Sequence, residues 1–213
     1  MNPTDFVTHL GQAKASAILR TQRTQAAHAA MEAALRGGFT VIEFTYSIPG
    51  ALELIQEFAR RPGIVVGAGT VLTLKEAEQA VDAGARYLVS PVVDEVVIDA
   101  AARLGVAAMP GCSTPTEMLQ AHRAGAPLQK LFPGAGTGPA FVQQCLGPLS
   151  FLKLVPTSGV TPENATDYLR AGAFALGFVN SLFQPDDIAS GDYDIIEDRS
   201  RRILETVHSS QAS

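Results

Sequence analysis

A recurring local pattern constrains the fold of this chain more than any other feature. Alanine-rich helical stretches end at a glycine, and a short run rich in Val, Ile, Leu or Phe follows, as in ALRGGFTVIEF (34–44) and LRAGAFALGF (169–178). The glycine is typical of a helix C-terminus, and the apolar run is typical of a buried strand. The pattern therefore predicts helices that alternate with strands.

The spacing of these glycines indicates how many units the chain holds. They are Gly38, Gly84, Gly105, Gly125 and Gly172, and they are separated by 46, 21, 20 and 47 residues. Each long gap is about twice a short one, so one further strand is expected in each, at 63–70 and at 150–157. An opening strand is expected at 15–20. The eight predicted strands end near Arg20, Phe44, Gly67, Ser90, Met109, Phe132, Val155 and Gly177.

Strict alternation implies parallel strands joined by right-handed crossovers. Eight such units favour a single-domain (β/α)8 TIM barrel over residues 1–213, with a helix at each end; the alternative is an open, flavodoxin-like sheet. No shift in composition marks a domain boundary. The final segment, EDRSRRILETVHSSQAS (197–213), predicts an amphipathic helix that frays into a disordered end.

Composition excludes several classes of protein. The 213 residues are 46% hydrophobic, enough for a large core, and the net charge of −5 predicts no nucleic-acid or anionic membrane surface. The two cysteines, Cys112 and Cys145, lack CxxC spacing, so we expect reduced thiols in a cytoplasmic protein. No signal peptide or membrane segment is predicted.

In a barrel of this kind the chemistry takes place at the C-terminal ends of the strands. The polar and glycine residues at those ends are therefore the candidates. They are Arg20, Thr21, Glu43, Thr45, Ser47, 67–70, Ser90, Pro91, Ser113, Thr114, Lys130, Phe132, Pro133, 157–159, Asn180 and Ser181.

Two lysines, Lys130 and Lys153, lie inside apolar strands. Burial lowers the pKa of a lysine and yields a neutral amine that can attack a carbonyl, so one of the two is a Schiff-base candidate. The alternative is that each side chain reaches past a helix to solvent. Glu43 closes an apolar strand, as a general acid/base with a raised pKa, as the ion-pair partner of a buried cation such as Lys130 or Arg20, or as both together.

Three loops suit anion binding. GAGTV (67–71) allows close backbone approach, or is a tight turn in which Thr70 belongs to the helix entry. Residues 157–159 and 180–181 follow the last two strands, where many barrels bind a phosphate. Thr161 with Pro162 is explained simply as a helix N-cap.

No metal site or cofactor is predicted. The four histidines, His9, His28, His122 and His208, fall in helical stretches without HxxxH or HxH spacing. Cys112 is expected to be a packed thiol, because no histidine reaches it in the barrel scheme.

Together these motifs resemble the class I 2-keto-3-deoxy-6-phosphogluconate (KDPG) and 4-hydroxy-2-oxoglutarate (KHG) aldolases. The resemblance extends from AILR (17–20) to NSLF (180–183), and KLFPG following GAGTVL is its most specific part. It implies a homotrimeric, cofactor-free barrel of the Entner–Doudoroff type. In such an enzyme Lys130 forms the Schiff base, Glu43 moves protons and Thr70 helps to hold the pyruvyl carboxylate. The expected substrate-binding residues are Arg20, Ser47, Gly69, Thr70, Pro91, Phe132, Thr157, Ser158, Gly159, Asn180 and Ser181.

Two positions depart from the gluconate-type pattern. Ser47 stands where those members carry an arginine, whereas the galactonate-type branch also lacks that arginine and carries one that matches Arg20. Ser158 and Asn180 replace glycines of the phosphate loops, which bears on whether the substrate is phosphorylated.

The expected reaction is reversible cleavage of a 2-keto-3-deoxy sugar acid, with a 6-phosphate, to pyruvate and an aldehyde such as glyceraldehyde 3-phosphate. The alternatives are a 2-oxo-acid decarboxylase, a 4-hydroxy-2-oxoglutarate aldolase acting on an unphosphorylated substrate, and a non-catalytic sugar-acid binder.

Overall fold

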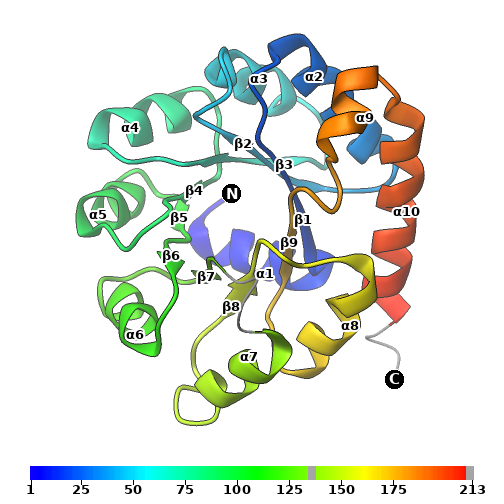
Figure 1. Ribbon diagram of the computed structural model, residues 1–213. Coiled ribbons are helices and arrows are strands. Elements are labelled where there is room, and N and C mark those ends of the chain that lie inside the picture. The colour runs from blue at the N-terminus through cyan, green and yellow to red at the C-terminus, as the bar shows by residue number, and fades with distance from the viewer. Residues whose placement is uncertain (134–137, 210–213) are drawn as a thin grey trace.

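The computed structural model describes residues 1–133 and 138–209, and within them parallel strands form a ring inside a ring of helices (Figure 1). The strands are β1 Ala15–Leu19, β2 Val41–Thr45, β3 Val65–Gly69, β4 Tyr87–Val89, β5 Ala107–Ala108, β6 Gly111–Cys112, β7 Gln129–Leu131, β8 Leu154–Pro156 and β9 Leu176–Phe178. The helices are α1 Pro3–Ala13, α2 Thr24–Arg36, α3 Ala51–Phe58, α4 Leu74–Asp82, α5 Glu95–Arg103, α6 Pro115–Arg123, α7 Gly138–Leu146, α8 Pro162–Arg170, α9 Pro185–Ser190 and α10 Tyr193–Ser209.

The five repeat glycines end their helices in the same way. Each lies two residues beyond the last helical residue and has a φ between +72° and +110°. The glycine N–H donates to the carbonyl three residues earlier, and the next N–H donates to the carbonyl five residues earlier. This is the Schellman arrangement, which only a left-handed residue completes, so glycine is favoured at each position. The predicted helix, glycine and strand units are confirmed.

The strands close into a barrel, so the alternative of an open flavodoxin-like sheet is wrong. One sheet has the order β5-β4-β3-β2-β1-β9 and the other the order β6-β7-β8, with parallel pairing throughout. A bridge between Thr157 and Gly177 joins β8 to β9, and the Gly111 N–H donates to the Ser90 carbonyl on the other side. The ring is therefore continuous.

The fifth predicted strand differs from the expectation that it ends near Met109. It is divided into β5 and β6, and Pro110 lies between them. Proline has no N–H to donate to a strand ladder, which accounts for the interruption. The Pro110 carbonyl still accepts a hydrogen bond from the Lys130 N–H, so the backbone continues across the gap to β7. The other strands end within two residues of the predicted positions.

Helix α1 closes the N-terminal end of the barrel, and Figure 1 shows it inside the ring of strands. Its buried residues Phe6 and Leu10 pack against the first inward-facing side chains of the strands, among them Val41, Val65 and Tyr87. The Phe6 and Tyr87 rings are stacked with centroids 4.3 Å apart. Because this end is filled by apolar side chains, the opposite end is left for chemistry.

Alternation along each strand sorts the remaining side chains. On β2, Val41 belongs to the inner cluster, while Ile42 and Phe44 belong to the outer core between strands and helices. Glu43 and Thr45 therefore face the barrel interior above Val41.

The C-terminal end that the sequence predicts to be disordered includes residues 210–213, which lie outside the described residues. Among the described helices, none combines the length and apolar character needed to cross a membrane.

Candidate active site

A cavity of about 590 Å³ lies at the C-terminal ends of the strands. It receives side chains from β1, β2 and β7 and from the loops that follow β7, β8 and β9. The predicted site residues that line it are Arg20, Lys130, Phe132, Thr157, Ser158, Gly159, Asn180 and Ser181. The further lining residues are Ile18, Thr45, Val160, Thr161 and Val179.

Lys130 and Glu43 form a buried pair beside this cavity: Lys130 lines it, and Glu43 contacts Lys130 without lining the cavity itself. Lys130 is the central residue of β7 and Glu43 that of β2, and the Lys130 Nζ lies 3.9 Å from the Glu43 Oε1. Glu43 is 1% exposed, and neither of its carboxylate oxygens has a hydrogen-bond partner among the described residues. Burial raises the pKa of Glu43, and the charges of Lys130 and Arg20 oppose that rise without cancelling it.

The other strand lysine lies elsewhere. Lys153 immediately precedes β8, at the N-terminal end of the barrel, and its backbone N–H donates to the Gln129 side chain. It is partly exposed and does not line the cavity. Of the two Schiff-base candidates, the fold therefore brings only Lys130 to the cavity and to Glu43.

Arg20 lies at the cavity rim, where a polar network holds it. Its guanidinium donates to the Thr70 Oγ1 at 2.8 Å and to the Ser47 Oγ at 3.3 Å, and the Ser47 Oγ lies 2.8 Å from the Thr45 Oγ1. Ser47 and Thr70 do not line the cavity themselves; they orient the residue that does. Thr70, with a φ of +62°, does not belong to the helix entry, because the N-cap of α4 is Thr73.

The loops after β8 and β9 present backbone donors to the same cavity. Among the described residues, the N–H groups of Ser158, Gly159, Val160, Asn180 and Ser181 donate no hydrogen bond. Ser158 and Gly159 both have positive φ, +70° and +77°, which turns the chain sharply there. Successive free N–H groups in such a turn form a concave anion-binding surface.

Thr161 and Pro162 lie where the sequence places them, at the start of α8. Thr161 is the N-cap, and its N–H donates to the Asn164 side chain, so the N-cap interpretation is confirmed.

Besides Ser47 and Thr70, two further predicted binding residues do not line the cavity. Gly69 lies directly against the Glu43 carboxylate, where an added Cβ would fall 2.0 Å from Oε1. Pro91 follows β4, and its carbonyl packs against the backbone of Gly111.

Two other candidates from the sequence, Thr114 and Cys112, have structural roles. Thr114 is the N-cap of α6 in a capping box with Glu117. Burial raises the pKa of the Cys112 thiol to about 12, as expected for a packed cysteine.

Thr45 lines the cavity as well; the sequence gives it as a strand-end candidate but not among the expected substrate-binding residues. Thr45 lies two residues after Glu43 on the same strand, so both side chains face the interior. Ile18 precedes Arg20 by the same interval on β1. Ile18 was missed by the sequence reasoning, and extending the alternation along each strand would have found it.

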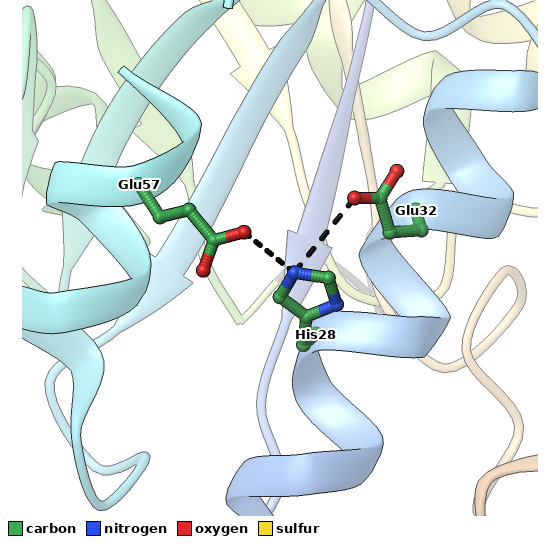
Figure 2. Close-up of side chains that lie close together, drawn as sticks. All are labelled: His28, Glu32 and Glu57. Carbon is green, nitrogen blue, oxygen red and sulfur yellow. Dashed lines mark hydrogen bonds and ion pairs between the residues drawn. The ribbon is translucent and has the colours of Figure 1, made fainter. Parts of the chain in front are cut away.

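A His/Glu cluster lies on the outside of the barrel, away from the cavity (Figure 2). His28 Nε2 lies 2.7 Å from Glu57 Oε1 and 3.8 Å from Glu32 Oε1, which links α2 to α3. Arg61 contacts both carboxylates and holds the pKa of Glu32 below its usual range. Because Arg61 already pairs with both carboxylates, the cluster is explained as an ion-pair network. The contact of His28 with Glu57 could not be predicted from the sequence, because the two residues are 29 positions apart.

Comparison with known proteins identifies the family. The family model described as KDPG and KHG aldolase matches residues 7–199. A Rhizobium meliloti protein named "Probable 2-dehydro-3-deoxy-6-phosphogalactonate aldolase" is 36% identical over 83% of this chain and 84% of its own length. The Escherichia coli "KHG/KDPG aldolase" is 32% identical over 82% of this chain and 83% of its own.

Solved structures have the same fold. The structure titled "Native KDPGal structure" superposes with a TM-score of 0.86 at 26% identity, covering 93% of this chain and 96% of the other. A KDPG aldolase from Legionella pneumophila, with pyruvate captured as a covalent carbinolamine, superposes with a TM-score of 0.84 at 22% identity, covering 92% and 97%. The sequence resemblance is thus confirmed, and the chain belongs to the KDPG and KHG aldolase family.

Proposed function

We propose that this protein is a class I aldolase that cleaves a 2-keto-3-deoxy sugar acid to pyruvate and an aldehyde. The observation that carries the proposal is the buried pair of Lys130, which lines the cavity, and Glu43, 3.9 Å from it. An amine beside a proton acceptor, in a site shielded from water, is the arrangement that Schiff-base chemistry requires. The lysine iminium serves as the electron sink, so the reaction as proposed uses no cofactor.

The reaction begins when the neutral Lys130 Nζ attacks the substrate C2 carbonyl and forms a carbinolamine. Loss of water, with a proton supplied by Glu43, gives the iminium. The Glu43 carboxylate then takes the C4 hydroxyl proton while the C3–C4 bond breaks, and that electron pair moves into the iminium to form an enamine. The aldehyde leaves, Glu43 returns the proton to C3, and hydrolysis releases pyruvate and Lys130.

Two features of the cavity lining favour an anionic substrate. Arg20 at the rim provides a cation, and the free N–H groups of residues 158–160 and 180–181 provide an uncharged anion site. Since the protein carries a net charge of −5, such local donors are needed to attract an anion. We therefore assign the substrate a 6-phosphate, which makes the aldehyde glyceraldehyde 3-phosphate for a six-carbon acid.

A second substrate is supported by a specific observation. Ser158 and Asn180 add side chains to the cavity at the proposed phosphate end. Both add volume where the family pattern has glycine, which favours a shorter, unphosphorylated acid such as 4-hydroxy-2-oxoglutarate.

The proposal extends to assembly and location. We assign a homotrimer, supported by exposed Leu72, Val92 and Val96 on two neighbouring units of the barrel. Cys112 and Cys145 are free and buried, which supports a cytoplasmic enzyme.

Borohydride trapping tests the chemistry. Incubation with pyruvate and borohydride should add one reduced adduct at Lys130, located by peptide mass spectrometry, and Lys130→Arg should abolish both the adduct and activity. Lys153→Arg is the matched control and should retain both. An adduct on Lys153, or none at all, would refute the assignment. Aldehyde release from a panel of phosphorylated and unphosphorylated acids then identifies the substrate, whereas carbon dioxide release would indicate a decarboxylase.

A further inference from the structure

The environment of Gly69 gives this glycine a function different from the one expected for it. The sequence places it among the substrate-binding residues, but it does not line the cavity. An ideal Cβ built on Gly69 would have as its three nearest atoms the Glu43 Oε1 at 2.0 Å, Cδ at 2.7 Å and Cγ at 3.1 Å. The Glu43 carboxyl group therefore occupies the space that any other residue at position 69 would fill.

The backbone does not itself require glycine at this position. Gly69 is the last residue of β3, it is absent from the glycines with positive φ, and its carbonyl accepts a hydrogen bond of 2.7 Å from the Tyr46 N–H. An alanine can adopt such a strand conformation without strain. The demand for a missing side chain therefore comes from Glu43.

Glu43 depends on this space because little else fixes its carboxylate. Neither oxygen has a hydrogen-bond partner among the described residues, and the contact with the Lys130 Nζ is 3.9 Å. In most proteins hydrogen bonds orient a buried carboxylate. Here the position of the group is set by packing against the Gly69 backbone and by attraction to Lys130.

We propose that Gly69 is a positioning residue for catalysis. Because it has no side chain, it leaves the space in which the Glu43 carboxylate lies, within reach of Lys130 and of the substrate. This inference rests on the proposed role of Glu43 in proton transfer. Contacts below 3.0 Å are essentially unknown for real Cβ atoms, so Gly69→Ala must move the carboxylate by about 1 Å or more. A displacement of that size in a reacting group costs on the order of 10²-fold in rate.

Gly69→Ala should lower kcat by about 10²-fold, with a smaller change in KM, while the borohydride adduct with pyruvate still forms at Lys130. Gly37→Ala is the matched control. Its added Cβ would fall 2.2 Å from the Ser200 Cβ, at the end of α2 and far from the cavity. It should lose thermal stability to a similar or larger extent and keep the wild-type kcat.

A double-mutant cycle tests whether Gly69 acts through Glu43. Glu43→Asp shortens the side chain, so in the Gly69→Ala background it should cost little further activity, or restore some, although it is harmful on its own. If the two losses in kcat simply multiply, Gly69 does not act through Glu43 and the proposal is wrong.

Thermal unfolding provides a measurement that does not depend on activity. Because the three nearest atoms are all from Glu43, the double variant Gly69→Ala/Glu43→Ala should unfold at a higher temperature than Gly69→Ala alone. An equal loss of Tm from Gly69→Ala in the wild-type and Glu43→Ala backgrounds would overturn the inference, even if one variant folds poorly. Full activity of Glu43→Gln would instead refute the proposed function and leave this steric coupling intact.

Discussion

At the scale of single residues, the buried Glu43 carboxylate leads to a prediction for the pH dependence. Burial raises the pKa of Glu43 above the usual 4.5 of a glutamate, and cleavage needs the ionised form as a base. Activity should therefore fall as the pH drops through this raised pKa. Glu43→Gln should slow turnover by about 10²-fold or more and remove this acid limb from the kcat/KM profile. Survival of the limb in Glu43→Gln would assign it to another group.

The same shift has a consequence for stability. A carboxyl group with a raised pKa in the folded state binds its proton more tightly there than in the unfolded chain. Its contribution to stability is full below the unfolded pKa and is lost as the pH rises through the folded pKa. At a pH above this raised pKa, where Glu43 is ionised and can act as a base, its buried charge therefore lowers the free energy of unfolding.

Arg20 offers a second prediction at this scale. It is exposed but held by Thr70 and Ser47 at the cavity rim. If it binds a substrate anion, Arg20→Ala should lower kcat/KM by roughly 10-fold or more, the value of one charge-assisted hydrogen bond. If it only tunes Glu43, its loss removes a charge that lowers the pKa of Glu43. The acid limb would then move to higher pH with unchanged anion affinity. Profiles of phosphorylated and unphosphorylated substrates across pH separate the two outcomes.

At the scale of the elements, the repeated helix ends lead to a prediction about stability alone. Gly105 has a φ of +72°, and no atom lies within 4 Å of an added Cβ. Gly105→Ala should therefore cost only the left-handed backbone strain, about 1 kcal/mol, or a Tm about 2–4 °C lower, with unchanged kcat. Gly172→Ala also meets Leu146 at 2.8 Å and should lose more. Equal losses at the two sites would show that strain alone determines the cost.

The elements also show why most of the fold is predictable from the sequence. Helix C-termini and buried strands have local chemical signatures, so the glycine spacing locates the units. The two long gaps have less regular helix ends: α3 is followed by a turn that reaches Gly63, and Gly147 after α7 lacks a positive φ. The division of the fifth strand at Pro110 was not predicted, because apolar character continues through it.

At the scale of the whole molecule, closure of the barrel converts strand ends into a site. It brings Glu43 and Lys130 together although they are 87 positions apart in the sequence, a proximity that no local pattern encodes. The candidate list could be drawn from the topology alone, since C-terminal strand ends converge. Lys130 was named on the same grounds as a possible partner of Glu43, which the structure confirms. The topology could not tell which of the other candidates line the cavity, because Gly69 and Pro91 are excluded from it by side-chain and backbone packing.

The assembly yields the last prediction. Leu72 and Val92 follow the paired strands β3 and β4, and Val96 is the second residue of α5. Their exposed fractions are 48%, 54% and 58%. Exposed apolar side chains on adjacent units mark an interaction surface, and a charge buried there would oppose association. Light scattering should give the mass of three copies for the wild type and of one copy for Val96→Glu. Ile195→Glu is the control, because Ile195 is also exposed but lies on α10, across the barrel from α5 (Figure 1). A trimeric Val96→Glu, or loss of the trimer in Ile195→Glu instead, would place the interface elsewhere.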